Sequence, residues 1–150
     1  MPHINLQMIP GDGPLIDIFV GVSFPRRDAM TAAGRVAPNP IRARALIDTG
    51  ASCSCVDPSI LQPLGVTPTG SQLIITPSTG QQGQVTNQYD VSILIIKSAQ
   101  HYLLVPSLPI VEAALHLPPV QGIQALIGRD VLANCLLIYD GSESQLTLSF

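Results

Sequence analysis

One aspartate in this sequence stands where a carboxylate could be held rigidly for acid-base chemistry. The segment Ala45 to Ser52 reads ALIDTGAS, so two aliphatic residues lead directly into Asp48. A carboxylate rarely follows buried strand residues unless its desolvation is offset. Thr49 and Gly50 fit a tight loop, because glycine adopts backbone conformations closed to other residues and the threonine hydroxyl can hydrogen-bond locally or to a second copy. We therefore predict that this loop fixes the Asp48 carboxylate in place.

The sequence gives less support to a serine or cysteine nucleophile, a disulfide framework or a metal site near this loop. A Ser52 or Cys53 nucleophile would need a positioned histidine, and the three histidines stand in no recognisable arrangement: His3, His101 and His116. Three cysteines are an odd number, which excludes a complete disulfide framework, and the Cys53–Cys55 pair lacks two further ligands at metal spacing. We expect no metal and no cofactor.

The length and composition of the chain predict one compact domain over residues 1–150. The chain is 46% hydrophobic and 11% charged, enough apolar residues for a real core. A net charge of -3 with only seven Lys and Arg residues leaves no basic footprint for nucleic acid. The N-terminus has no signal-peptide pattern and no apolar run reaches 18 residues, so we expect a cytoplasmic, soluble domain without direct membrane contact.

The elements that would position Asp48 are short strands. Fourteen prolines and twelve glycines divide the chain, and several segments alternate with period two, so the class is mainly β. Strands are expected around residues 4–8, 16–22, 41–47, 73–75, 85–96, 102–105, 126–127, 136–139 and 146–150. Pro106 should end one of them. Residues 24–40 look like a surface loop with one helical turn at 28–33, and short helices should follow Asp57-Pro58 and Arg129.

These motifs, in this order, resemble the retropepsin branch of the aspartic proteases. Asp-Thr-Gly-Ala after two aliphatic residues is similar to the family's catalytic loop, and Ala125 to Leu132, ALIGRDVL, is similar to its second signature. Asn87 to Ile95 resembles the strand that leaves the flap, and Ser78 to Gly83 the flap tip. The segments PHINL and LTLSF, near the two ends of the chain, resemble the strands through which two subunits interlock.

The resemblance implies a single-domain acid protease fold: a closed β-barrel with a flap hairpin and one or two short helices. It implies catalytic roles for Asp48, Thr49 and Gly50. The expected substrate-binding residues are Ala51, Ser52, Thr79, Gly80, Gln81, Gln82, Gly83, Ile47, Ile75, Val85 and Leu126. Gly128, Arg129 and Asp130 are expected to support the loop, with Gly128 required by close backbone approach. Ser52 replaces the acid common in viral members, so Asp57 or Asp130 is a candidate partner for Arg129.

Hydrolysis of a peptide by acid-base catalysis then requires two copies of the chain. Two carboxylates a few Å apart can share one proton and serve as acid and base together. The sequence has one Asp-Thr-Gly, so the second Asp48 should come from a symmetric partner. We expect a homodimeric aspartic endopeptidase that prefers apolar residues near the cleaved bond and acidic pH. The alternatives are a catalytically weak peptide-binding or dimerisation module on the same fold, and a domain that processes its own precursor.

Overall fold

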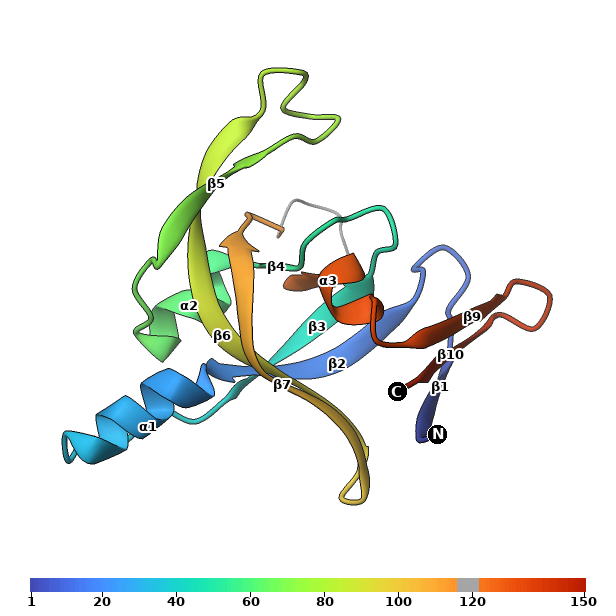
Figure 1. Cartoon of the computed structure of the whole chain (residues 1–150). Helices are drawn as coiled ribbons and strands as arrows, with labels where there is room; N and C mark the ends of the chain where they lie inside the picture. Colours follow the sequence, from blue (N-terminus) through green and yellow to red (C-terminus); the bar gives the residue numbers. More distant parts are fainter. Residues whose placement is uncertain (116–121) are drawn as a thin grey trace.

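The computed structural model describes residues 1–115 and 122–150, so His116 lies outside the description (Figure 1). The strands are β1 (His3–Gln7), β2 (Leu15–Val22), β3 (Ile41–Ile47), β4 (Cys55–Val56), β5 (Gly70–Ile74), β6 (Gln84–Ser98), β7 (His101–Glu112), β8 (Ala125–Ile127), β9 (Leu136–Asp140) and β10 (Gln145–Ser149). The helices are α1 (Phe24–Ala32), α2 (Pro58–Leu64) and α3 (Arg129–Leu132). No helix in the described ranges has the length and apolar character needed to cross a membrane.

Most of the strands close into a barrel. Their order in the larger sheet is β2-β3-β8-β4-β7-β6-β5, and β2 also pairs with β6. The closed ring therefore runs through β2, β3, β8, β4, β7 and β6, while β5 pairs with β6 alone. The predicted fold, mainly β with a closed barrel and short helices, is confirmed.

Period-two alternation places aliphatic side chains inside the barrel. On β3, Ala43, Ala45 and Ile47 are buried, whereas Arg42 and Arg44, which alternate with them, are exposed. The inward positions of β2 and β6 contribute further buried aliphatic residues to the same cluster. Each fully buried valine, leucine or isoleucine side chain stabilises the fold by roughly 1.5–3 kcal/mol. This packing fixes the end of β3, and therefore the start of the Asp48 loop.

The two ends of the chain pair with each other in a second sheet, in the order β1-β10-β9. Ile4 of β1 lies opposite Leu148 of β10, and both are buried. At the β9 edge, Leu136 and Ile138 are 52% and 51% exposed. The two predicted terminal strands are therefore present as β1 and β10, and they pair with each other within a single chain.

The segment after β2 is more helical than the sequence indicated. Instead of a loop with one turn, α1 runs from Phe24 to Ala32, with a proline in its first turn, where proline is well tolerated. The guanidinium of Arg27 lies 3.8 Å from the centre of the Phe24 ring. None of the residues of α1 is buried. The helix therefore lacks the apolar stripe that sequence patterns detect.

Strand β7 continues through Pro106, which was expected to end it. The predicted strand stopped before Pro106, yet β7 extends to Glu112. Pro106 lies at a β-bulge where the pairing of β7 with β6 shifts by one residue, so no regular ladder bond is lost there. This extension pairs Glu112 with Val56 of β4.

Strands β5 and β6 form a long hairpin that projects away from the barrel (Figure 1). Leu73 lies directly opposite Val85, so the two strands form the predicted hairpin. Gly80 and Gly83 in the connection adopt positive φ angles of 64° and 65°, which favour glycine. The β-carbon of any other residue at position 83 would lie 2.8 Å from the Ile74 carbonyl oxygen. The glycines are therefore required by the turn itself.

Candidate active site

Asp48 follows β3 directly, and the backbone around it holds its carboxylate in place. The Asp48 amide donates to the Ile127 carbonyl at 2.9 Å, which ties the loop to β8. Its Oδ1 atom accepts hydrogen bonds from the Gly50 amide at 2.8 Å and the Ala51 amide at 3.3 Å. No described residue donates a hydrogen bond to the other oxygen, Oδ2, which is therefore available to a water molecule or a second carboxylate. Asp48 is half-buried, while Thr49 and Gly50 are exposed.

Gly128 allows the strand behind this loop to approach it closely. A β-carbon at position 128 would lie 2.7 Å from the carbonyl carbon of Cys53 and 3.0 Å from the Ser54 nitrogen. Real β-carbons do not approach backbone atoms this closely, so only glycine fits. Position 128 is therefore packed directly against the backbone of Cys53 and Ser54.

Ser54 and Asp130 lock the loop to α3. The buried Ser54 hydroxyl donates to Asp130 Oδ1 at 2.7 Å and accepts from the Gly128 amide at 2.9 Å. The Ser54 amide donates to Asp130 Oδ2 at 2.7 Å. Both oxygens of the carboxylate are therefore used in bracing. Ser54 was not singled out from the sequence, because a serine gives no pattern until its distant partner is known.

Arg129 contacts the loop through its backbone and side chain. Its amide donates to the Ala51 carbonyl at 3.0 Å, and its guanidinium donates to the Thr49 carbonyl at 3.4 Å. The two suggested acidic partners are engaged elsewhere. Asp130 binds Ser54, and Asp57 caps α2 by accepting from the Ser59 amide at 2.9 Å. Arg129 thus supports the loop through carbonyl oxygens.

A cleft of about 1100 Å³ lies between the Asp48 loop and the β5–β6 hairpin. Several predicted substrate-binding residues line it: Ala51, Ser52, Ile75, Thr79, Val85 and Leu126. Ile47 does not, because its side chain points into the barrel core and is 5% exposed. Gly80, Gln81, Gln82 and Gly83 lie at the hairpin turn, outside the residues that line the cleft of a single chain.

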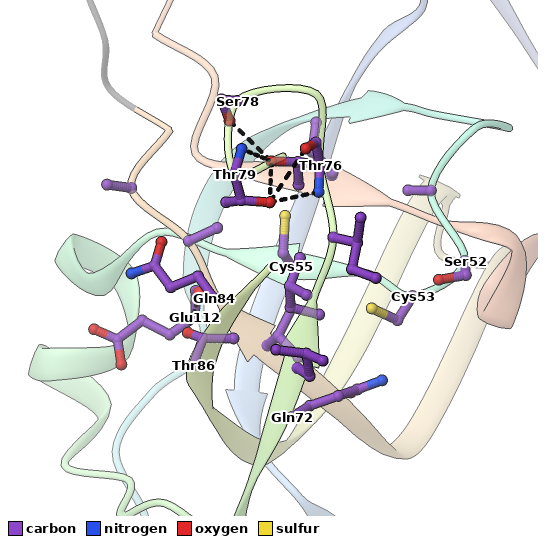
Figure 2. A pocket seen from close by; sticks show the side chains of 18 of the residues that line it. Ser52, Cys53, Cys55, Gln72, Thr76, Ser78, Thr79, Gln84, Thr86 and Glu112 are labelled. Carbon is purple, nitrogen blue, oxygen red and sulfur yellow. Dashed lines mark hydrogen bonds between the residues drawn. The ribbon is translucent and has the colours of Figure 1, made fainter. Parts of the chain in front are cut away.

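The part of the hairpin turn that borders the cleft is Thr76 to Thr79, whereas the predicted flap tip runs from Ser78 to Gly83. The Thr76 amide donates to the Thr79 hydroxyl at 2.8 Å, and the hydroxyls of Thr76 and Ser78 lie 2.8 Å apart. Figure 2 shows this hydroxyl network above Cys55. The turn is thereby held together by its own side chains. The sequence Thr-Pro-Ser-Thr at residues 76–79 is typical of such a turn and could have indicated it.

One end of the cleft is polar and acidic. Glu112 accepts hydrogen bonds at Oε2 from the Tyr89 hydroxyl at 2.9 Å and from the Asn87 amide at 3.3 Å. Burial, followed by the bond to Glu112 and its charge, raises the pKa of Tyr89, which keeps the phenol protonated as a donor. Glu112 could not be found from the sequence, because β7 was expected to end before it.

Two thiols also border the cleft. Burial raises the pKa of Cys55 to about 12, and burial raises the pKa of Cys53 as well, with the nearby Asp130 charge adding to the effect. A thiol is nucleophilic only as a thiolate, so raised pKa values argue against a cysteine nucleophile here. No group of three potential metal-ligating side chains was found among the described residues.

The closed barrel, the Asp-Thr-Gly loop and the hairpin above it define the aspartic protease fold, and more narrowly its retropepsin-like form. The chain is similar to the structure of a retropepsin-like aspartic protease from Rickettsia conorii, with a TM-score of 0.60 and 15% identity over 99% of this chain and 90% of that one. It is also similar to an aspartic proteinase from Irpex lacteus, with a TM-score of 0.53 and 11% identity over 98% of this chain. It spans 46% of the Irpex chain, about half its length.

Comparison at the level of sequence adds no relatives. No protein-family model matches the chain, and no curated protein matches it. The likeness to the two solved structures, at 15% and 11% identity, therefore establishes the fold.

Proposed function

We propose that this chain is an aspartic endopeptidase that hydrolyses peptide bonds with a water molecule activated between the Asp48 carboxylates of two copies. The observation that carries the proposal is the geometry of Asp48. Its Oδ1 is held by two backbone amides beside a cleft large enough for a peptide, while Oδ2 is available for chemistry. The two solved structures compared above are an aspartic protease and an aspartic proteinase, which supports the same reaction.

A homodimer follows from the number of carboxylates that the reaction needs. The chain supplies one Asp-Thr-Gly and covers 46% of the Irpex proteinase, so two copies would match the length of that enzyme. Thr49 and Gly50, beside Asp48, are exposed in the single chain and would be covered at a two-fold axis through the loops. The Thr49 hydroxyls would then brace the two loops against each other.

In this arrangement the two carboxylates share one proton. The ionised carboxylate takes a proton from water as the oxygen attacks the peptide carbonyl, and the protonated carboxyl gives its proton to the carbonyl oxygen. Collapse of the tetrahedral intermediate breaks the carbon–nitrogen bond as a proton passes to the departing amine. Activity requires one neutral and one ionised carboxyl, so it should be highest at acidic pH.

The cleft suits an extended peptide with apolar side chains. Leu73, Ile75 and Val85 line it and are 55%, 64% and 66% exposed in the single chain. Exposed apolar side chains gathered in one place mark a binding surface. A substrate lying as a strand beneath the hairpin would cover them, which supports a preference for apolar residues near the cleaved bond.

The direct test is Asp48→Asn. We would incubate wild-type and variant proteins with a diverse peptide pool from pH 3 to 7 and identify new termini by mass spectrometry. Circular dichroism would verify that the variant is folded, and sedimentation would establish the oligomeric state. We expect cleavage between apolar residues at acidic pH by the wild type and a loss of at least about 10³-fold in the variant.

A wild-type dimer that leaves the whole pool intact would refute the proposal. It would favour the alternative of a catalytically weak peptide-binding or dimerisation module. An active monomer would refute the shared dyad, because one Asp48 cannot act as both acid and base.

A further inference from the structure

Glu112 presents an oriented carboxylate at the cleft. Two side chains from β6, Asn87 and Tyr89, donate to its Oε2 atom at 3.3 and 2.9 Å. The Thr86 hydroxyl donates to the Glu112 carbonyl oxygen at 2.8 Å, which fixes the backbone from which the side chain extends. The carboxylate is therefore preorganised before any ligand arrives, and preorganisation lowers the entropic cost of binding.

The other oxygen of this carboxylate, Oε1, accepts no hydrogen bond from the described residues, and no described cation pairs with Glu112. The two described ion pairs are Arg27 with Asp28 and Arg42 with Asp17. A half-buried carboxylate without a countercharge is favourable for binding a cation that donates hydrogen bonds.

The cleft as a whole has one sign of charge. The two charged side chains among its described lining residues are Asp48 and Glu112, and neither lysine nor arginine nor histidine borders it there. A lining of one sign of charge attracts ligands of the opposite sign and disfavours acidic ones. The cleft therefore favours a basic peptide over an acidic one.

We propose that Glu112 is a specificity-determining residue that binds the guanidinium or ammonium group of a basic residue in the substrate peptide. The inference rests on the proposed endopeptidase function and narrows its substrates to apolar peptides that carry an arginine or lysine. Figure 2 shows Glu112, Gln84 and Thr86 at one end of the cleft and Ser52 and Cys53 at the other. The basic residue would therefore lie away from the cleaved bond, with its aliphatic stem along the apolar side chains of the hairpin.

The test compares arginine with citrulline, its uncharged isostere, at each position of a cleaved peptide. We expect the wild type to favour arginine at one or more outer positions by about ten-fold in kcat/KM, which corresponds to ~1.4 kcal/mol. Glu112→Gln keeps the shape and an acceptor for Tyr89 but removes the charge, so the ratio should fall below about two-fold. Raising the salt concentration should reduce the wild-type ratio, since the site is partly exposed.

The chain offers a matched control. Glu143 is its other glutamate, exposed in the turn between β9 and β10, and Glu143→Gln should leave the arginine preference unchanged. The inference would be overturned by a wild-type ratio near one at every position, or by a ratio that survives Glu112→Gln. In either case cleavage itself would still occur, so the proposed function would stand.

A binding measurement separates the two failures. Labelled arginine and citrulline peptides would be titrated by fluorescence anisotropy against Asp48→Asn, with and without Glu112→Gln. If the wild type cleaves no peptide, the proposed function is refuted. The inference about Glu112 is then decided by whether the arginine peptide binds more tightly than the citrulline peptide and whether Glu112→Gln removes that preference. Equal binding of the two peptides, or no binding of either, would overturn it.

Discussion

Substituting Gly128 with alanine should push the Asp48 loop away from the strand behind it. The new β-carbon would lie 2.7 Å from the carbonyl carbon and 2.8 Å from the carbonyl oxygen of Cys53. Carbon atoms in favourable contact are ~3.5–4.0 Å apart, so the two backbone segments must separate by about 1 Å. Because the obstructing atoms belong to the backbone, no side-chain rotation relieves the clash.

The cost follows from two contributions. Overpacking in a tight interior typically destabilises a protein by roughly 1–3 kcal/mol. The same displacement stretches the hydrogen bonds from Gly128 to the Ser54 hydroxyl, at 2.9 Å, and from the Arg129 amide to the Ala51 carbonyl, at 3.0 Å. Each such bond contributes about 0.5–1.5 kcal/mol. We expect Gly128→Ala to lower the free energy of unfolding by about 2–4 kcal/mol.

Urea denaturation followed by circular dichroism would measure this loss, and peptide cleavage would be assayed where the variant is still folded. Activity should fall as well, because the Asp48 amide is bound to the carbonyl of Ile127, next to Gly128. Gly70→Ala is the matched control, since a β-carbon there meets no atom within 4 Å and its φ is ordinary. It should change stability by less than about 0.5 kcal/mol. A Gly128→Ala variant as stable and active as the control would refute the close-approach argument.

Two further predictions concern the same loop. Ser54→Ala leaves the buried Gly128 amide without its acceptor and removes a donor from Asp130. The free energy of unfolding measured in urea should therefore fall by about 1–3 kcal/mol. Ser59 is exposed, so Ser59→Ala should leave it nearly unchanged. Equal stabilities would contradict the bracing role. The Cys55 thiol, with its pKa raised to about 12, should resist iodoacetamide at pH 8 in the folded protein and react after denaturation, as peptide mapping would detect. The free energy of unfolding should also fall above pH 9, the ordinary thiol pKa, because the unfolded chain then loses the Cys55 proton that the folded chain keeps. The decrease should be up to about 1.4 kcal/mol per pH unit larger in the wild type than in Cys55→Ala.

The parts predicted correctly are those encoded by adjacent residues. Alternation on β3 indicated which side chains face the core, and Asp57-Pro58 marked the start of α2, which ends at Gly65 in the left-handed conformation. Helix α1 was underestimated because none of its residues is buried. Strand β7 was cut short because the bulge that accommodates Pro106 depends on its pairing with β6.

The sequence by itself determined the Asp48 loop and the period-two strands, because the preferences of turns and strands arise between neighbours along the chain. Only the tertiary structure decided what surrounds Asp48. Closure of the barrel brought Ser54 against Asp130 and carried Glu112 to the cleft beside Asn87 and Tyr89. These contacts join residues from 23 to 76 positions apart. They depend on the register of paired strands, which no single segment specifies.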